Sequence, residues 1–357
     1  MIEQSCAFVL HFDDVGIGDR AAVGGKGASL GELTRAGIRV PPGYVVSTGA
    51  FERFLGGIDP QGSIRAAVKS LAADDLTAIS RVSEEIGEQI ANAPLPPELQ
   101  DAILAGYADL CAGESNLAVA VRSSATSEDS SEASFAGLQD TYLWICGGND
   151  VVHAVRRCWA SLYSTESISY RLRFKLPEEG LAMGVVVQRM VDSRCSGVMF
   201  TRSPLTGDRS VIAIECSWGL GSATVSGEVT PDKYVVSKVT EEIIKRTVSH
   251  KTVMHIPDIV AGGVRAEPVP PERRHLACLS EEQIVELARV GKSVEAHYQC
   301  PQDIEWAFAP DAGGSERLYM LQSRPETAWA SKEGKPTAVP KARAFDHVFE
   351  MLGRGKA

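Results

Sequence analysis

Two acidic residues near the end of the sequence have the spacing of metal ligands. Asp303 and Glu305 alternate with apolar residues, so both carboxylates project from one face of a predicted β-strand. Carboxylates this close repel each other unless a cation lies between them. Hard oxygen ligands beside a polyphosphate suit Mg²⁺ better than zinc. The pattern therefore predicts a magnesium site on this strand.

A second predicted strand, residues 318–322, offers complementary groups. Gln322 and Arg324 share one face, which supplies an amide and a fixed guanidinium fork for phosphate oxygens. The plainer alternative is a surface hairpin in which glutamate and arginine pair across the two strands.

Arg122 follows an apolar run, Ala118–Val121, that is typical of a buried strand. We expect the arginine at the end of that strand. A guanidinium there is costly unless it meets an anion, because its charge cannot be removed at working pH. The small residues 123–126 leave room for a ligand and supply hydroxyl and N–H donors. The alternative is an interdomain loop in which Arg122 pairs with Glu128 or Asp129.

Lys26 lies in a glycine-rich segment, Gly24–Gly27, ahead of a predicted helix at residues 28–36. Such a segment predicts a mobile loop that approaches phosphates, with the lysine as a point charge near a helix N-terminus. It is not a P-loop, because Arg20 replaces the first glycine and Gly27 replaces the final serine or threonine. The alternative is a solvated surface lysine.

Gln188 interrupts a buried apolar strand predicted at residues 183–191. Its amide can bond the edge of an adenine ring while Met190 packs on the face of the ring. By pattern alone, a core strand with one edge-facing amide is the better fit. The glycine-bearing loop 219–227 either caps phosphates or is a tight connection between strands.

The remaining elements form a scaffold for these residues. Ser47 or Thr48 can cap a helix through Leu55, and Ser280 opens a capping box before a helix at residues 284–299. Further predicted strands occupy residues 7–12, 141–145, 196–204, 210–218, 232–238 and 241–250. Further predicted helices occupy residues 61–112, Asp150 to Phe174 with Asp150 as the cap, and 344–352 after a linker at 331–342.

The bulk composition narrows the functional classes. The chain has 357 residues, of which 44% are hydrophobic, and a net charge of −10 that argues against nucleic-acid binding. Neither a transmembrane run nor a signal peptide is recognisable in it. Eight dispersed cysteines without a CxxC pair predict reduced thiols of a cytoplasmic protein and disfavour a zinc or iron–sulfur site.

Several long motifs occur together and in one order. They are GGKGASLGEL (24–33), VPPGYVVST (40–48), VRSSATSEDSSEASFAGLQDTYL (121–143), SGVMFTRSP (196–204), WGLG (218–221), GEVTPDKY (227–234), DIEW (303–306) and LQSRPET (321–327). This set resembles the nucleotide domain of the phosphoenolpyruvate synthase and pyruvate phosphate dikinase group, which includes rifamycin phosphotransferase. The resemblance covers nearly all of residues 8–328.

The resemblance implies an α+β ATP-grasp fold whose two lobes, with mainly antiparallel sheets and flanking helices, grip ATP and Mg²⁺ between them. We expect lobes at residues 1–189 and 190–329, followed by a linker and terminal helix at 330–357. Position by position, the resemblance implies phosphate contacts for Lys26 and Arg122, nucleotide-loop contacts for Gly137 and Thr141, an adenine-side contact for Gln188, and phosphate and magnesium contacts for Glu305, Gln322 and Arg324. Lys26, Arg122 and Arg324 would neutralise charge during transfer, and Asp303 is a metal ligand by geometry.

The family's phosphate-accepting histidine, in a Thr-Ser-His context, has no match among the seven histidines. The chain therefore resembles the ATP-binding subunit of a split member such as phenylphosphate synthase. In that enzyme a partner subunit carries the histidine and the phenol site, and ATP yields AMP and phosphate. Two alternatives remain: an excised domain of rifamycin phosphotransferase or phosphoenolpyruvate synthase, and a non-catalytic ATP sensor or docking protein.

Overall fold

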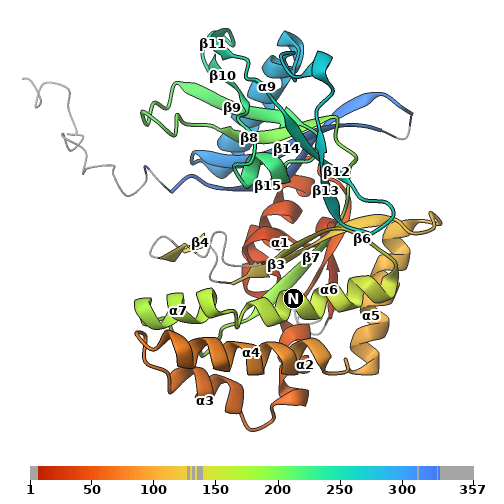
Figure 1. Ribbon diagram of the computed structural model, residues 1–357, viewed down its shortest axis with the longest axis vertical. Coiled ribbons are helices and arrows are strands. Elements are labelled where there is room, and N and C mark those ends of the chain that lie inside the picture. Colours follow the sequence, from red (N-terminus) through yellow and green to blue (C-terminus); the bar gives the residue numbers. More distant parts are fainter. Residues whose placement is uncertain are drawn as a thin grey trace, which may run out of the picture.

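The computed structural model describes residues 7–126, 129–130, 133–134, 140–311, 313–327 and 329. Two lobes lie one above the other, each built on its own β-sheet, and helix α1 (Arg20–Arg35) lies between them (Figure 1). This is the α+β architecture with mainly antiparallel sheets and flanking helices that the sequence predicts. In the described part of the chain, we find no helix with both the length and the apolarity needed to span a bilayer.

The first lobe contains a five-stranded antiparallel sheet in the order β1-β2-β7-β3-β6. Its strands are β1 (Val9–His11), β2 (Gly43–Val46), β3 (Ala118–Ala125), β6 (Thr141–Cys146) and β7 (Met183–Arg189). A separate pair of two-residue strands, β4 (Asp129–Ser130) and β5 (Ala133–Ser134), falls within the connection from β3 to β6.

Alternation along β7 gives this sheet two buried faces. Val185 and Val187 face a large core formed with α2 (Thr48–Ile58), α4 (Leu76–Asn92), α5 (Pro97–Cys111) and α6 (Gly148–Ser161). Val186 faces the other way, toward Ala28 and Leu30 of α1. The two remaining helices, α3 (Ser63–Lys69) and α7 (Thr165–Phe174), extend the helical layer on the first face.

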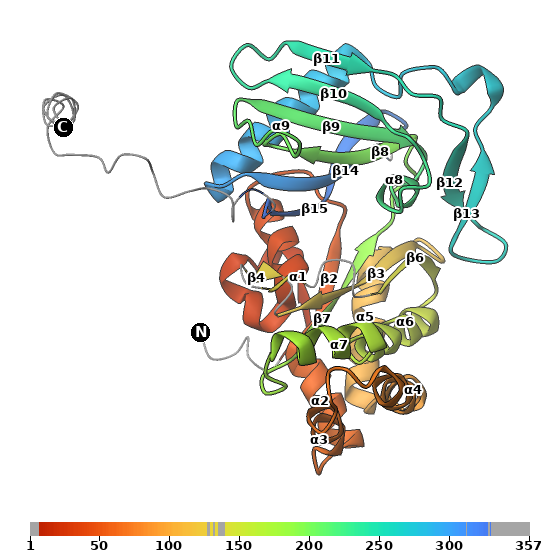
Figure 2. The same ribbon diagram turned by 60° about the vertical axis from the view of Figure 1, so that its left-hand side comes forward.

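The second lobe is a six-stranded antiparallel sheet in the order β11-β10-β9-β8-β14-β15. Its strands are β8 (Cys195–Phe200), β9 (Val211–Trp218), β10 (Asp232–Ser237), β11 (Ile243–Thr247), β14 (Gln302–Pro310) and β15 (Glu316–Pro325). Helix α9 (Glu281–Tyr298) packs Ile284, Leu287 and Val294 into its core. The short helix α8 (Ser222–Val225) and the hairpin β12 (Val253–Pro257) and β13 (Val264–Pro268) project toward the first lobe (Figure 2).

Helix α1 belongs to the first lobe in sequence but contacts both lobes. Leu33 is buried in the core of the second lobe, whereas Leu30 is buried against the first sheet. The Ser29 hydroxyl donates to the Ser323 carbonyl of β15 over 2.6 Å. Beyond the helix, the Arg39 carbonyl accepts from Met320 N over 2.9 Å. The helix is therefore packed between the lobes and bonded to the second one.

Strand β3 does not end at Arg122, as the sequence suggested, but runs on to Ala125. The strand therefore includes the two serines that follow the arginine, Ser123 and Ser124. Both are completely buried, and the Ser124 hydroxyl donates to the Val23 carbonyl of α1 over 2.8 Å. Because its polar atoms are satisfied against a helix, this hydroxyl-rich segment can continue as a strand.

The glycine-rich segment around Lys26 is also different from the prediction. It lies inside α1 and is not a loop ahead of the helix, and the helical dihedral angles break at Gly24, whose φ is +71°. A Cβ atom at Gly24 would lie 1.8 Å from the Ser124 carbonyl oxygen. Glycine is thus required for both its backbone conformation and the close approach of β3.

Replacing Gly24 with alanine should lower the free energy of unfolding by more than about 3 kcal/mol, because the strain of a glycine-only backbone conformation (φ +71°, ψ 179°) and a backbone clash add together. Gly37 is the matched control, since its φ is +74° but nothing lies within 4 Å of an added Cβ. Alanine there should cost only the strain, about 1 kcal/mol. Urea unfolding measures both, and equal losses would contradict the packing argument.

The single helix predicted from Asp150 to Phe174 is two helices. Gly147, with φ at +94°, precedes α6, so Asp150 lies in the first turn and is not the cap. The Ser164 hydroxyl accepts from Ser167 N over 3.2 Å and begins α7. A serine at that position can cap the start of a second helix. The apolar periodicity continues across it, so the pattern predicts one helix where there are two.

Two predicted helix starts are confirmed. The Ser47 hydroxyl accepts from Ala50 N over 3.3 Å. Ser280 and Gln283 form the reciprocal capping box, with distances of 3.3 Å and 3.0 Å. The predicted linker at 331–342 and the helix at 344–352 lie outside the described residues.

Candidate functional site

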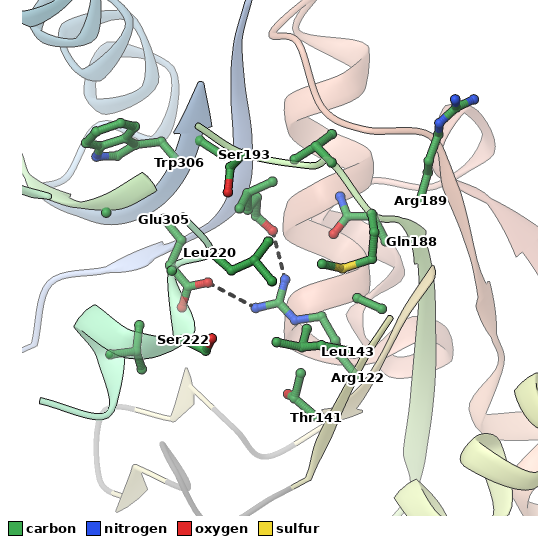
Figure 3. A pocket seen from close by; sticks show the side chains of 18 of the residues that line it. Arg122, Thr141, Leu143, Gln188, Arg189, Ser193, Leu220, Ser222, Glu305 and Trp306 are labelled. Carbon is green, nitrogen blue, oxygen red and sulfur yellow. Dashed lines mark hydrogen bonds and ion pairs between the residues drawn. The ribbon is translucent and has the colours of Figure 1, made fainter. Parts of the chain in front are cut away.

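Arg122 joins the two lobes at the centre of the cleft. Its Nη1 donates to the Leu321 carbonyl over 2.9 Å, and its Nη2 lies 3.2 Å from Glu305 Oε2 (Figure 3). Nη2 also donates to Gln322 Oε1. The side chain of Arg122 is 10% exposed. All three partners come from the β14–β15 hairpin of the second lobe. Arg122 therefore brings a buried positive charge from the sheet of the first lobe to the acidic face of the β14–β15 hairpin in the second lobe.

The β14–β15 hairpin holds the predicted polar groups on one face. Asp303 lies opposite Arg324 and Glu305 lies opposite Gln322, with a register shift directly after Glu305. Arg324 Nη2 and Asp303 Oδ2 are 2.8 Å apart, which is the cross-strand pairing of a plain hairpin. Glu305, however, pairs with Arg122 of the other lobe. The hairpin therefore forms one wall of an interlobe site.

Burial raises the pKa of the Asp303 carboxyl above its ordinary value of 3.8. The Arg324 guanidinium opposes this shift, while the charges of Glu305 and Glu326 add to it. Because burial disfavours the ionised form of Asp303, a cation that binds beside this carboxylate would stabilise that form.

This raised pKa predicts a pH dependence of stability. The folded protein holds the Asp303 proton more tightly than the unfolded chain does. The protonated carboxyl therefore contributes to the free energy of unfolding below pH 3.8, and this contribution is lost as pH rises through the higher folded pKa. Asp303→Asn should remove that decline, as measured by urea unfolding across the range. Asp208, whose pKa is lowered by hydrogen bonds from Ser210, is the control. Asp208→Asn should change the pH dependence of the free energy of unfolding in the opposite direction. Identical changes in the two variants would contradict the assignment.

A cavity of about 370 Å³ lies between the lobes beside Arg122. Four residues that the sequence singled out for nucleotide binding are in its lining: Arg122, Thr141, Gln188 and Glu305. Met190, predicted to pack on the base, lines it as well. Gln188 is 3% exposed, and its Nε2 donates to the Pro41 carbonyl over 3.3 Å. An elongated ligand with an apolar end and an anionic end suits this lining.

The other predicted residues surround this cavity without lining it. Lys26 Nζ donates to the Ser123 carbonyl over 3.0 Å, next to Arg122 in the chain. Gln322 adjoins the cavity through Arg122, and Arg324 and Asp303 continue the same face of the hairpin. Gly137, predicted in the nucleotide loop, lies outside the described residues.

The family described as pyruvate phosphate dikinase, AMP/ATP-binding domain, matches residues 20–344 of this chain. The chain belongs to this family. Its members bind AMP or ATP through this domain, which agrees with the nucleotide-binding prediction made from the motifs.

Curated relatives support the same assignment. A probable phosphoenolpyruvate synthase of Methanothermobacter thermautotrophicus is 44% identical over 98% of this chain, and the phosphoenolpyruvate synthase of Pyrococcus furiosus is 39% identical over 97%. A rifampicin phosphotransferase of a Streptomyces species is 40% identical over 98%. The chain spans 50%, 47% and 38% of the lengths of these relatives. They are phosphotransferases, and this chain corresponds to their nucleotide-binding part.

Three further lining residues of this dikinase-family site carry no individual prediction, although two of them lie in the loop 219–227, for which phosphate capping was one of two expectations. Leu220 in the turn after β9, Ser222 at the start of α8, and Leu143 of β6 all face the cavity. The glycines flanking Leu220 in the WGLG motif were the available signal, because small residues let a backbone approach a ligand. Glu326 was also missed, although it lies two residues after Arg324 in the LQSRPET motif.

The described groups fit a magnesium-bound nucleotide. Among the buried polar atoms without a hydrogen-bond partner in the described residues are Arg122 Nε and Glu326 Oε2, together with Nε1 of the cavity-lining Trp306. The first is a donor suited to a phosphate oxygen, and the second is an acceptor suited to a cation or its water. Both atoms adjoin the hairpin that carries Asp303 and Glu305.

A second group of potential metal ligands lies elsewhere in the second lobe. Cys216, Asp232 and Cys278 are buried, and their ligand atoms lie within 4.8 Å of one another. Burial raises the pKa of the Cys216 thiol well above 9, and Asp232 Oδ1 already lies 2.5 Å from the Lys251 ammonium. The Cys278 N–H also donates to Asp232, over 2.9 Å. Asp232 is therefore already engaged in a buried ion pair with Lys251, and the Cys216 thiol is held in its protonated form.

Proposed function

We propose that this chain binds Mg-ATP between its lobes and transfers a phosphoryl group to a histidine on a partner subunit or a further domain. ATP would be converted to AMP and phosphate, as in a dikinase-type reaction. The observation that carries this proposal is the convergence of Arg122 from the first lobe on Glu305 and Gln322 of the second. A buried cation beside paired carboxylates and an apolar cavity suits a polyphosphate nucleotide.

The proposed roles follow from position and charge. Arg122 and Arg324 would bind phosphate oxygens. Lys26, whose Nζ donates to the carbonyl of Ser123 beside Arg122 on β3, would add a third cation. Gln188 and Met190 would hold the base. Magnesium, held by Asp303 and Glu305, would neutralise phosphate charge during transfer. The catalytic contribution of this chain is then positioning and charge neutralisation.

The accepting histidine would come from outside the nucleotide cavity. No histidine is present among the described residues that line the cavity, and none of the seven lies in a Thr-Ser-His context. We propose a separate histidine-bearing subunit, with phenol or a related hydroxyl compound as the final acceptor, in the reducing cytoplasm. The free cysteines of the described structure are compatible with that compartment.

A second candidate acceptor is pyruvate. It is favoured by the identity of 44% and 39% to proteins named as phosphoenolpyruvate synthases. The two candidates differ in the acceptor alone, because the nucleotide chemistry on this chain would be the same.

The test uses the whole chain with Mg-ATP labelled at the β-phosphorus. Isothermal calorimetry should detect binding of the nucleotide, and a histidine-bearing protein that co-purifies from the native cell should gain an acid-labile label with release of AMP. Phenol or pyruvate, added separately, should then remove the label from that protein. Absence of calorimetric binding, or robust phosphorylation of a small molecule by the chain alone, would overturn the proposal.

A further inference from the structure

Three side chains at the edge of the cavity form a serine–histidine–glutamate chain. Ser222 Oγ lies 2.8 Å from His255 Nδ1, and His255 Nε2 lies 3.2 Å from Glu228 Oε2. Both contacts are satisfied when the neutral imidazole carries its proton on Nε2, donates it to Glu228 and accepts the serine hydroxyl at Nδ1. A hydroxyl, a base and a carboxylate that orients the base are the features of an activated nucleophile.

The backbone fixes the serine and the histidine relative to each other. Leu220 N donates to the His255 carbonyl over 2.9 Å, just before Ser222 in the chain. Gly219 has φ at +76°, and a Cβ there would lie 2.3 Å from the same His255 oxygen. Strand β12 is therefore held against the loop after β9, which keeps the imidazole at the serine without a flexible connection.

Neighbouring serines in the same region have a different arrangement. Ser193 Oγ and Ser196 Oγ both donate to the Gly219 carbonyl, over 2.9 Å and 2.6 Å. Their protons are directed to a backbone acceptor that cannot remove them. Ser222 Oγ, in contrast, lies beside an imidazole nitrogen, and with the imidazole proton on Nε2 the serine donates to Nδ1, so its oxygen can be deprotonated as it attacks.

Ser222 also faces the cavity proposed for the nucleotide. It lines this cavity together with Arg122, Thr141 and Glu305. Figure 3 shows Ser222 on the same side as Glu305 and Thr141, away from Gln188. If Gln188 marks the base end, Ser222 lies toward the phosphate end.

We propose that Ser222 is a phosphorylation site that accepts the γ-phosphoryl group of ATP bound in this cavity, an inference that rests on the proposed function. Ser222 Oγ forms a bond to the γ-phosphorus while the bond from that phosphorus to the β,γ-bridging oxygen breaks. ADP leaves with the bonding electron pair, and the hydroxyl proton passes to His255 Nδ1. The protonated imidazole is stabilised by Glu228. The product is phosphoserine and ADP, in contrast to the AMP of transfer to histidine.

The phosphoserine would bring negative charge into the lining that Ser222 shares with Glu305 and Arg122. A second nucleotide would then meet repulsion at its phosphates. The modification would therefore act as an internal brake on the same site.

The experiment incubates the full-length chain with Mg-ATP labelled at the γ-phosphorus and maps the label by peptide mass spectrometry. We expect an acid-stable label on Ser222 and an equal amount of ADP. Ser222→Ala should abolish the label while calorimetry still detects ATP binding. His255→Gln should slow labelling by about a hundredfold or more, as expected for loss of a general base.

Two further variants separate positioning from folding. Gly219→Ala should slow labelling, because the added Cβ displaces His255 without changing a titratable group. His297→Gln is the matched control, since His297 Nε2 lies 2.7 Å from Glu32 in a similar histidine–glutamate pair away from the cavity. It should label at the normal rate.

The outcomes distinguish this inference from the proposed function. If ATP binds and a partner histidine is labelled from the β-phosphorus, but Ser222 gains no γ-label, the serine inference alone is wrong. An acid-labile label on His255 would also refute it. If ATP does not bind, the proposed function fails and the serine inference fails with it.

Discussion

Replacing Arg122 with alanine is expected to slow phosphoryl transfer from ATP by about a thousandfold or more. A positioned arginine that stabilises charge on a transferring phosphoryl group contributes this much in other phosphotransferases. Arg122 also bonds Leu321 and Gln322 across the cleft, so its loss should lower the free energy of unfolding by about 1–3 kcal/mol. Label transfer from β-labelled ATP and urea unfolding measure the two effects separately.

Arg189 is the matched control for this experiment. It lines the same cavity, but its side chain points away from it and pairs with Glu114 at the surface, over 3.0 Å. Arg189→Ala should change the transfer rate by less than about threefold, as expected for an exposed ion pair. Arg122→Lys tests geometry, because lysine keeps the charge but cannot reproduce the planar fork. If Arg122→Lys transferred at the normal rate, the argument from guanidinium geometry would be wrong.

Replacing Glu305 with glutamine is expected to lower Mg-ATP-dependent transfer by about a hundredfold or more, with little change in stability without ATP. The substitution keeps the size of the side chain but removes the charge that would meet magnesium. Arg122 would retain its bonds to Leu321 and Gln322, so the nucleotide-free fold should tolerate the change. Transfer assays over a range of magnesium concentrations, together with thermal unfolding, test this directly.

Glu316 provides a control on the same hairpin. Its side chain is 31% exposed, as is that of Glu305, and it also pairs with an arginine, at 2.9 Å from Arg194 Nη2. Glu316→Gln should leave the magnesium dependence unchanged. Similar losses of transfer in both variants, or a large loss of stability for Glu305→Gln without ATP, would refute the metal-ligand assignment.

Local patterns were sufficient to predict much of the scaffold. The alternation of Asp303 and Glu305 with buried residues placed both carboxylates on one face of β14, and Gln322 and Arg324 share the facing side of β15. The capping box at Ser280 likewise depends on residues three apart. In each case the deciding interaction is encoded within one element or one hairpin.

Long-range contacts explain what the patterns missed. Arg122 and Glu305 are 183 positions apart in the sequence, and only the packing of the two lobes brings them together. The serine–histidine pair spans 33 positions and depends on where β12 meets the loop after β9. Gly24 looked like a loop residue because its reason for being glycine, the Ser124 carbonyl, lies on a distant strand. Such requirements are invisible to periodicity.

Helix α1 has a consequence for how this molecule can be divided and how it can move. A fragment starting at residue 190 would lack Leu33 from its own core and would leave Met320 N without the Arg39 carbonyl, so it should be prone to aggregation. A fragment of the first 189 residues would, conversely, expose the side of α1 that carries Ser29. Opening of the cleft must therefore carry this helix with one lobe and shear it across the other. The contacts that Leu33 and Ser29 make with the second lobe would resist that shear.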